Sequence, residues 1–171
     1  MHVMLDLETL DTKATSVILS IGMASFDSAG VRGKLLLYPK IDEQFEEGRT
    51  VSSSTLLWWF GQSEQARMDL VKGERLSKPS VEKAIVEWLS AQGKLEGMWG
   101  NGSDFDNPML SHYLPGMWQY FLNRCYRTLK SVYGKSAPKP PVNSDAHNAL
   151  SDAVWQAEHL ILINKAVGGI L

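Results

Sequence analysis

The sequence is poor in cysteine, in net charge and in long apolar runs, and each shortage argues against a class of protein. A single cysteine, Cys125, leaves no internal disulfide and no multi-cysteine zinc site. A formal net charge of −2 is low for a protein that binds nucleic acid through its phosphates alone. Any role on nucleic acid must therefore depend on a local basic patch or on bound metal cations.

Signals for membranes and secretion are also lacking. No apolar run approaches the roughly 20 residues that cross a bilayer. Residues 1–7 lack the basic start and the cleavage site of a signal peptide. With 44% hydrophobic and 21% charged residues, the composition is that of an ordinary globular protein. We expect a soluble, cytoplasmic protein, with no membrane partner, whose residues 1–171 form a single domain.

Apolar, β-prone segments come first along the chain. Residues 3–7, 17–26 and 33–38 follow one another closely, and the turn-forming residues 27–30 separate the second from the third. This order predicts three leading antiparallel strands joined by short links. Residues 94–99 predict a fourth strand.

Helical patterns fill most of the remaining chain. Serines just before apolar, periodic segments predict helix starts near residues 52–54, 63 and 80. Together with the strands, the helices predict a mixed α/β fold in which helices cover a central sheet. The expected helices lie around residues 56–58, 63–71, 81–89, 107–114, 124–133 and 146–166.

Two carboxylates lie at the end of the first expected strand. Asp6 and Glu8 are two residues apart, so on a strand their side chains project to the same face. Adjacent carboxylates repel one another, and burial increases the repulsion. A divalent cation with oxygen ligands would remove this conflict. Taken alone, the pair is better explained by a strand that ends in a solvated turn.

A second polar cluster, residues 100–107, follows the fourth expected strand and precedes a helix. Loops at strand ends often carry functional sites, and either Asp104 or Asp106 could face a metal ion. The simpler alternative is a turn of Asn, Gly and Asp residues in which Asp106 caps the following helix.

The third cluster combines a histidine with an aspartate near the start of the last helix. His147 is a natural proton carrier, and Asp152 lies five residues further on among apolar neighbours. A carboxylate beside a core-facing stripe is costly unless it is paired or bound to metal. The small residues Ala149 and Ala153 would let another backbone or a ligand approach closely.

Considered together, the three clusters form a pattern. Asp-x-Glu-Thr occurs at residues 6–9, Asn-x-x-x-Phe-Asp at 101–106, and His-x-Ala-x-x-Asp at 147–152. In this order and with these separations the motifs resemble those of the DEDDh group of 3′–5′ exonucleases, which have the ribonuclease H-like fold. The finer resemblance, carried by residues 58–59, 62–67 and 99–102, is to exodeoxyribonuclease VIII-like and DexA-type exonucleases of phages and bacteria.

The resemblance implies a two-metal mechanism that releases nucleoside 5′-monophosphates from the 3′ end of nucleic acid. Asp6, Glu8, Asp106 and Asp152 would hold two Mg²⁺ or Mn²⁺ ions. His147 would act as general base. The resemblance places Asp106, after Phe105, in the ligand position rather than Asp104.

The resemblance and the composition also suggest residues that bind the substrate. Thr9 and Leu10 would lie against the terminal nucleotide, and Asn101 belongs to the second motif. Trp58 and Trp59 could stack on bases, although the core is the better explanation for at least one of them. Arg127 belongs to a basic stretch, residues 124–139, that could follow phosphates or could be a solvated helix face.

Several alternatives stay open at this point. The same site would serve an exoribonuclease or RNA-trimming enzyme, because local geometry decides how a 2′-hydroxyl is recognised. A proofreading subunit and a non-catalytic nucleic-acid-binding module are further options. The sequence leaves open DNA or RNA, single or double strands, and the oligomeric state, with a homodimer among the options.

Overall fold

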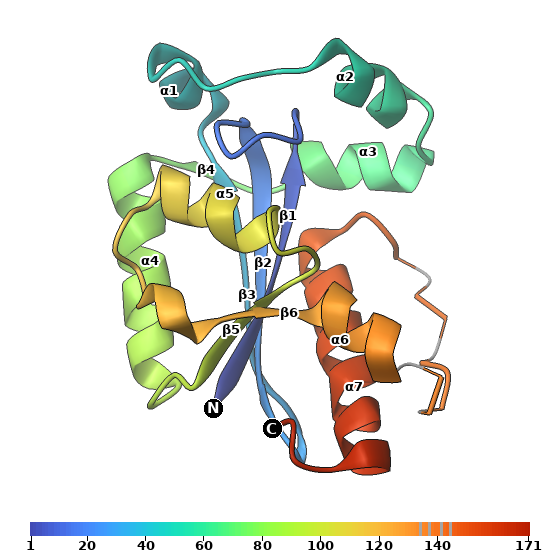
Figure 1. Cartoon of the computed structure of the whole chain (residues 1–171). Coiled ribbons are helices and arrows are strands. Elements are labelled where there is room, and N and C mark those ends of the chain that lie inside the picture. Colours follow the sequence, from blue (N-terminus) through green and yellow to red (C-terminus); the bar gives the residue numbers. More distant parts are fainter. Residues whose placement is uncertain (134, 137, 141, 144) are drawn as a thin grey trace.

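Six strands form one mixed sheet in the order β4-β3-β2-β1-β5-β6 (Figure 1). The structure, a computed structural model, describes residues 1–133, 135–136, 138–140, 142–143 and 145–171; Gly134, Ala137, Pro141 and Ser144 lie outside this part. The strands are β1 His2–Thr9, β2 Ile18–Asp27, β3 Gly30–Pro39, β4 Arg75–Leu76, β5 Gly97–Gly100 and β6 Asn123–Cys125.

The predicted arrangement of the first strands is confirmed. β1 pairs antiparallel with β2, and β2 pairs antiparallel with β3. The predicted fourth strand is β5, which lies parallel to β1 on its other side. The edge strands β4 and β6 were not predicted, because two and three residues are too few to show an alternating pattern.

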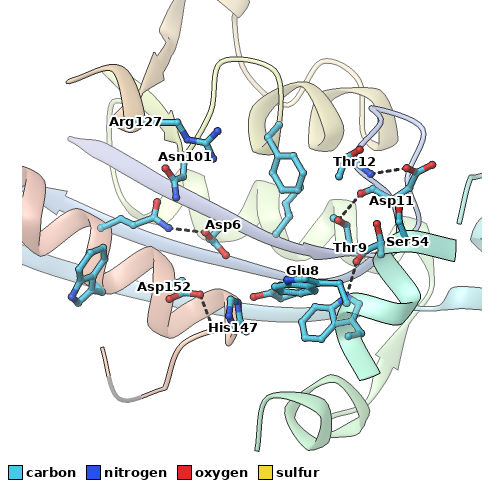
Figure 2. A pocket seen from close by; sticks show the side chains of 17 residues that line it. Asp6, Glu8, Thr9, Asp11, Thr12, Ser54, Asn101, Arg127, His147 and Asp152 are labelled. Carbon is cyan, nitrogen blue, oxygen red and sulfur yellow. Dashed lines mark hydrogen bonds between the residues drawn. The ribbon is translucent and has the colours of Figure 1, made fainter. Parts of the chain in front are cut away.

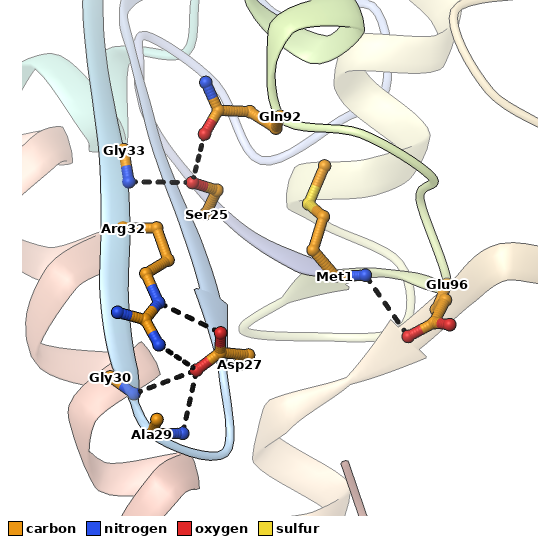
Figure 3. A network of polar contacts seen from close by, with 9 residues as sticks. All are labelled: Met1, Ser25, Asp27, Ala29, Gly30, Arg32, Gly33, Gln92 and Glu96. Carbon is orange, nitrogen blue, oxygen red and sulfur yellow. Dashed lines mark hydrogen bonds and ion pairs between the residues drawn. The ribbon is translucent and has the colours of Figure 1, made fainter.

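The hairpin between β2 and β3 closes at the expected turn (Figure 3). The Asp27 carboxylate accepts hydrogen bonds from the backbone amides of Ala29 and Gly30 at 2.8 and 3.1 Å. Asp27 also forms an ion pair with Arg32, whose exposure in water limits its contribution to stability. The turn is therefore fixed mainly by a side chain that accepts from its own backbone.

Seven α-helices surround the sheet in the described part of the chain. The prediction missed helix α1 (Ile41–Glu46), and it placed three helix starts wrongly. The last helix begins at Ala149 rather than near residue 146. Helix α4 begins earlier, after Ser77, so Ser80 lies inside it. Arg124 lies in β6, before α6. The helices are α1 Ile41–Glu46, α2 Ser53–Phe60, α3 Glu64–Val71, α4 Lys78–Ala91, α5 Asp106–Tyr113, α6 Tyr126–Tyr133 and α7 Ala149–Val167. None of them, within the described ranges, has both the length and the apolar character that crossing a bilayer requires.

Each face of the sheet has its own apolar core, and β1 contributes to both. Val3, Leu5 and Leu7 pack into the cluster that includes residues of α4 and α5. Met4 packs on the opposite face with residues of α6 and α7. Because side chains alternate along a strand, Asp6 and Glu8 project to the same face as Met4, toward α7. Figure 1 shows α4 and α5 on one side of the sheet and α6 and α7 on the other.

A glycine in β2 allows α7 to approach the sheet very closely beside Asp6. Gly22 is the register partner of Asp6. A Cβ atom on Gly22 would lie 2.2 Å from the backbone carbonyl of Ala149 and 2.4 Å from the amide nitrogen of Leu150. The first turn of α7 therefore lies directly on the sheet, where a side chain would otherwise be.

We expect Gly22→Ala to destabilise the protein by about 3 kcal/mol or more, because the added methyl group meets backbone that cannot rotate away. Denaturant unfolding measures the loss. Gly30→Ala is the matched control, since nothing lies within 4 Å of a Cβ atom there. It should change the free energy of unfolding by less than about 0.5 kcal/mol. Equal effects of the two substitutions would contradict the close approach of α7.

Candidate active site

A cavity of about 540 Å³ opens at the end of β1, between α2, α6, α7 and the loop that follows β5. Figure 2 shows Asp6 and Glu8 of β1 facing His147 and Asp152, with Asn101 and Arg127 toward one end. The other end is polar and includes Asp11 and Thr12 (Figure 2). Of the predicted site residues, the cavity brings together Asp6, Glu8, Thr9, Trp58, Trp59, Asn101, Arg127, His147 and Asp152.

The two carboxylates of β1 are both buried. Asp6 is 8% exposed and Glu8 is 7% exposed. The amide nitrogen of Gln156 donates a hydrogen bond of 2.7 Å to Oδ1 of Asp6. Gln156 was not predicted, although its place one helical turn after Asp152 puts it on the same face of α7 and was a usable signal.

Asp106 lies behind the cavity rather than in its lining, and it is 1% exposed. Its Oδ1 accepts from the amide of Leu7 at 3.1 Å, and its Oδ2 accepts from the amide of Asn101 at 2.7 Å. The carboxylate thus joins β1 to the loop after β5. Asp104, the alternative at this position, is exposed.

His147 and Asp152 are joined by a hydrogen bond of 2.9 Å from the His147 amide to Oδ2 of Asp152. His147 precedes α7 and has a φ of 68°, in the left-handed region that costs a residue with a side chain about 1 kcal/mol or more. Its ring meets the ring of Trp58 edge-on, with centroids 5.0 Å apart. Ligand atoms of Glu8, His147 and Asp152 all lie within 4.8 Å of one another.

Burial and mutual repulsion dominate the electrostatics of the β1 carboxylates. Burial raises the pKa of Asp6 well above its ordinary range, and the charges of Asp106 and Glu8 raise it further. Burial is also the largest influence on Glu8, followed by the charges of Asp152 and Asp106; together they raise its pKa to about 8. At neutral pH the metal-free cluster therefore retains protons that isolated carboxylates would lose.

The other two carboxylates show the same conflict in weaker form. Burial raises the pKa of Asp106 to about 6, against the amides of Asn101 and Leu7, whose hydrogen bonds favour the ionised form. Burial also raises the pKa of Asp152, and the His147 amide opposes this shift.

The donor set fits divalent cations. In the described part of the chain, no lysine or arginine forms an ion pair with any of the four carboxylates. Hard cations such as Mg²⁺ prefer carboxylate oxygens, and a bound cation reverses the repulsion that raises these pKa values. Carboxylate oxygens of Glu8 and Asp152 and a ring nitrogen of His147 lie close enough together to ligate one ion.

The predicted substrate-binding residues are divided between the cavity wall and the core. Trp58 is 45% exposed, whereas Trp59 is 5% exposed and its ring nitrogen donates to the Thr9 carbonyl at 2.9 Å. Trp59 is thus the core member of the pair, although one side of it borders the cavity. Leu10 packs with Trp59 in an apolar cluster instead of lining the cavity.

Sequence reasoning missed the hydroxyl-rich end of the cavity. No motif marked these residues, because they come from the loop after β1 and from the first turn of α2. Asp11 is 5% exposed, and its Oδ1 accepts from the Thr12 amide at 2.7 Å. Besides Thr9, which the first motif includes, the side chains that line this end are Asp11, Thr12, Ser54 and Thr55.

A family model matches residues 1–163 of the chain, and its description is "3'-5' exoribonuclease Rv2179c-like domain". The chain belongs to this Rv2179c-like family. It is accordingly a 3′–5′ exonuclease that acts on nucleic acid, as the sequence predicted. A search of curated proteins gave no match.

Solved structures share the fold at low sequence identity. Exonuclease X in complex with 5′ overhanging duplex DNA is 16% identical, with a TM-score of 0.61, covering 99% of this chain and 94% of that chain. A full-length 3′-exonuclease is 13% identical, with a TM-score of 0.58, covering 96% of this chain and 81% of that one. Both likenesses establish a mixed α/β exonuclease fold.

Without divalent cations, we expect stability to fall as the pH rises from about 5 to about 9. The folded pKa of Glu8 is about 8, against an ordinary value of 4.5, so the folded chain binds more protons than the unfolded chain in this window. The free energy of unfolding must then decrease with rising pH, and Asp6 contributes with the same sign.

Thermal unfolding in a chelator measures this effect, and Tm should drop by roughly 10 °C across the window. Millimolar Mg²⁺ should restore most of the loss at the alkaline end, and Asp6→Asn should flatten the pH dependence. A Tm that responds neither to pH nor to Mg²⁺ would contradict the electrostatic description of the site.

Proposed function

We propose that this exonuclease is of the DEDDh type on a ribonuclease H-like fold, with residues 1–171 acting as one exonuclease domain. The supporting observation is the group of buried carboxylates beside His147, contributed by segments far apart in the chain. Asp6, Glu8, Asp106 and Asp152 would hold two Mg²⁺ or Mn²⁺ ions. The closeness of the chain to DexA-type enzymes and its cytoplasmic location remain predictions from the sequence.

When bound, the cations supply positive charge at the scissile phosphate and make a water molecule more acidic. The chain's own residues orient the reacting groups and transfer the proton. His147, in its neutral form, accepts the proton of the attacking water at a ring nitrogen. Its amide hydrogen bond to Asp152 and its T-shaped ring contact with Trp58 hold the imidazole at the cavity wall.

Selection of the 3′ end follows from the shape of the cavity. Glu8 and Thr9 lie where β1 ends, and a terminal hydroxyl would meet them there. Trp58, half exposed beside His147, offers a face on which the terminal base can stack without being identified. Arg127 and Asn101 lie toward the opposite end, where a guanidinium can pair with a phosphate. Leu10 stays as a predicted neighbour of the terminal bases.

RNA is the substrate class that we favour, because the family description names an exoribonuclease. The hydroxyl-bearing side chains at the polar end of the cavity are consistent with this preference. A 2′-hydroxyl both donates and accepts hydrogen bonds, and so do Thr12, Ser54 and Thr55.

The test combines substrate, metal and active-site variants. Matched single-stranded RNA, single-stranded DNA and duplex DNA, each labelled at the 5′ end, are incubated with and without Mg²⁺. We expect Mg²⁺-dependent, stepwise shortening from the 3′ end, fastest on RNA. His147→Ala should lower kcat about 10²- to 10⁴-fold, the usual contribution of a general base. Asp6→Ala should lower kcat at least as far.

Two results would overturn the proposal. One is shortening at an unchanged rate in a chelator, and the other is wild-type activity of both His147→Ala and Asp6→Ala. Asp104→Ala is the matched control, because this carboxylate is exposed and lies two residues from Asp106. It should retain nearly full activity.

A further inference from the structure

Helix α3 carries a carboxylate that no proposed step uses. The side chain of Asp69 is 10% exposed and does not line the cavity. Its Oδ1 accepts from Gln65 at 2.8 Å and from Lys72 at 2.6 Å. Its Oδ2 is turned toward a different element and accepts from the amide nitrogen of Asn148 at 3.3 Å. Asp69 therefore joins α3 to the residue that follows His147.

Asn148 is the N-cap of α7, and its hydrogen bonds determine how its amide group is turned. The side-chain oxygen accepts from the Ser151 amide at 3.1 Å, so the side-chain nitrogen must face Asp69. The backbone carbonyl of Asn148 accepts from the Asp152 amide at 2.9 Å. The orientation of Asn148 is thus coupled to both neighbours that bear on the chemistry, His147 and Asp152.

His147 needs such support because its backbone is strained. A φ of 68° persists in a residue with a side chain only where surrounding contacts hold it. Trp58 contacts the ring of His147, and Asp152 accepts from its amide. The bond from Asn148 to Asp69 ties the next residue of the same segment to α3, which contributes no residue to the cavity lining.

Helix α3 is itself well anchored, so it can serve as a fixed support. Ser63 caps its start by accepting from the Ala66 amide at 3.2 Å. Arg67 donates to the carbonyl of Phe60, at the end of α2, at 3.0 Å. Ala66 is 2% exposed and packs in the cluster that contains Trp59. Residues 62–67, which the sequence singled out, thus fix α3 against the cavity wall.

We propose that Asp69 is a positioning residue: by accepting from Asn148, it holds His147 in the strained conformation that places its ring at the cavity. The inference rests on the proposed role of His147 as general base. It gives a buried carboxylate remote from the catalytic set a function in the reaction, carried by a single side-chain contact.

The direct test is steady-state kinetics on 3′ trimming of RNA in Mg²⁺. Asp69→Ala should lower kcat about tenfold and change KM less than about threefold, because a small misplacement of a catalytic group costs rate rather than binding. Lys72→Ala is the matched control: it removes the exposed partner of Asp69 and leaves Asn148 untouched. It should leave kcat within about twofold of wild type.

Two further variants separate positioning from folding of α7. Asn148→Ser retains an N-cap acceptor of equal rank but lacks the amide that donates to Asp69, so it should reproduce the loss in kcat while Tm changes little. The double variant Asp69→Asn with Asn148→Asp restores one donor and one acceptor in the reverse direction. Recovery of kcat in the double variant is the rescue that the proposal requires.

A readout independent of activity follows the His147 ring. Its ring lies edge-on to Trp58 and Trp59, with centroids 5.0 and 6.3 Å away, so ring currents shift its NMR resonances. Asp69→Ala should reduce this shift, and Lys72→Ala should not. The resonance is assigned by its loss in His147→Ala.

A double-mutant cycle distinguishes the failure of this inference from the failure of the proposed function. In a His147→Ala background, Asp69→Ala should cause no further loss, because Asp69 acts through His147. Fully additive losses, an equal loss from Lys72→Ala, or an unchanged His147 resonance would overturn the positioning role alone. Wild-type activity of His147→Ala would overturn the general-base role instead, and the resonance would still test the contact.

Discussion

Repulsion among buried carboxylates is the constraint on which the rest of this structure depends. A central strand is an unfavourable place for charge, yet β1 directs Asp6 and Glu8 toward the same face as the apolar Met4. The fold surrounds these groups with hydrogen-bond donors, among them Gln156 and backbone amides at Asp106, but with no salt-bridge partner among the described residues. Such a cluster is stable only if it retains protons or gains cations.

The topology brings the remaining site residues to β1, and it needs only a few unusual positions to do so. The parallel strand β5 lies beside β1, so the loop after β5 delivers Asp106 to the back of the cavity. The absence of a side chain at Gly22 lets the backbone of α7 lie on the sheet next to Asp6. Asp152 and Gln156 then face β1 from successive turns of the same helix. The strained His147 joins this arrangement from the segment just before α7.

Those parts of the molecule that depend on local periodicity could be predicted from the sequence. The apolar, β-prone run of residues 3–7 predicted β1, and the two-residue spacing of Asp6 and Glu8 placed both side chains on one face. The serine caps predicted α2 and α3 closely, and Ser63 does accept from the first turn of α3. Local sequence patterns did not predict the short strands β4 and β6. They also gave the wrong N-cap for α4, where both Ser77 and Ser80 could begin the helix.

Contacts between distant segments could not be predicted from local sequence patterns. No spacing rule relates Asp69 to Asn148, or Gly22 to Ala149, because tertiary packing alone brings them together. The choice of Asp106 over Asp104 rested on the resemblance to DEDDh exonucleases, and the structure buries Asp106 while Asp104 stays exposed. The exposures of Trp58 and Trp59 likewise could not be separated before the packing of α2 was known.

The most direct measurement is anomalous X-ray scattering from crystals soaked in Mn²⁺. We expect two manganese peaks in the cavity, both within bonding distance of carboxylate oxygens from Asp6, Glu8, Asp106 or Asp152. A soaked crystal of active protein without a peak among these side chains, or with manganese bound only elsewhere on the surface, would contradict this expectation.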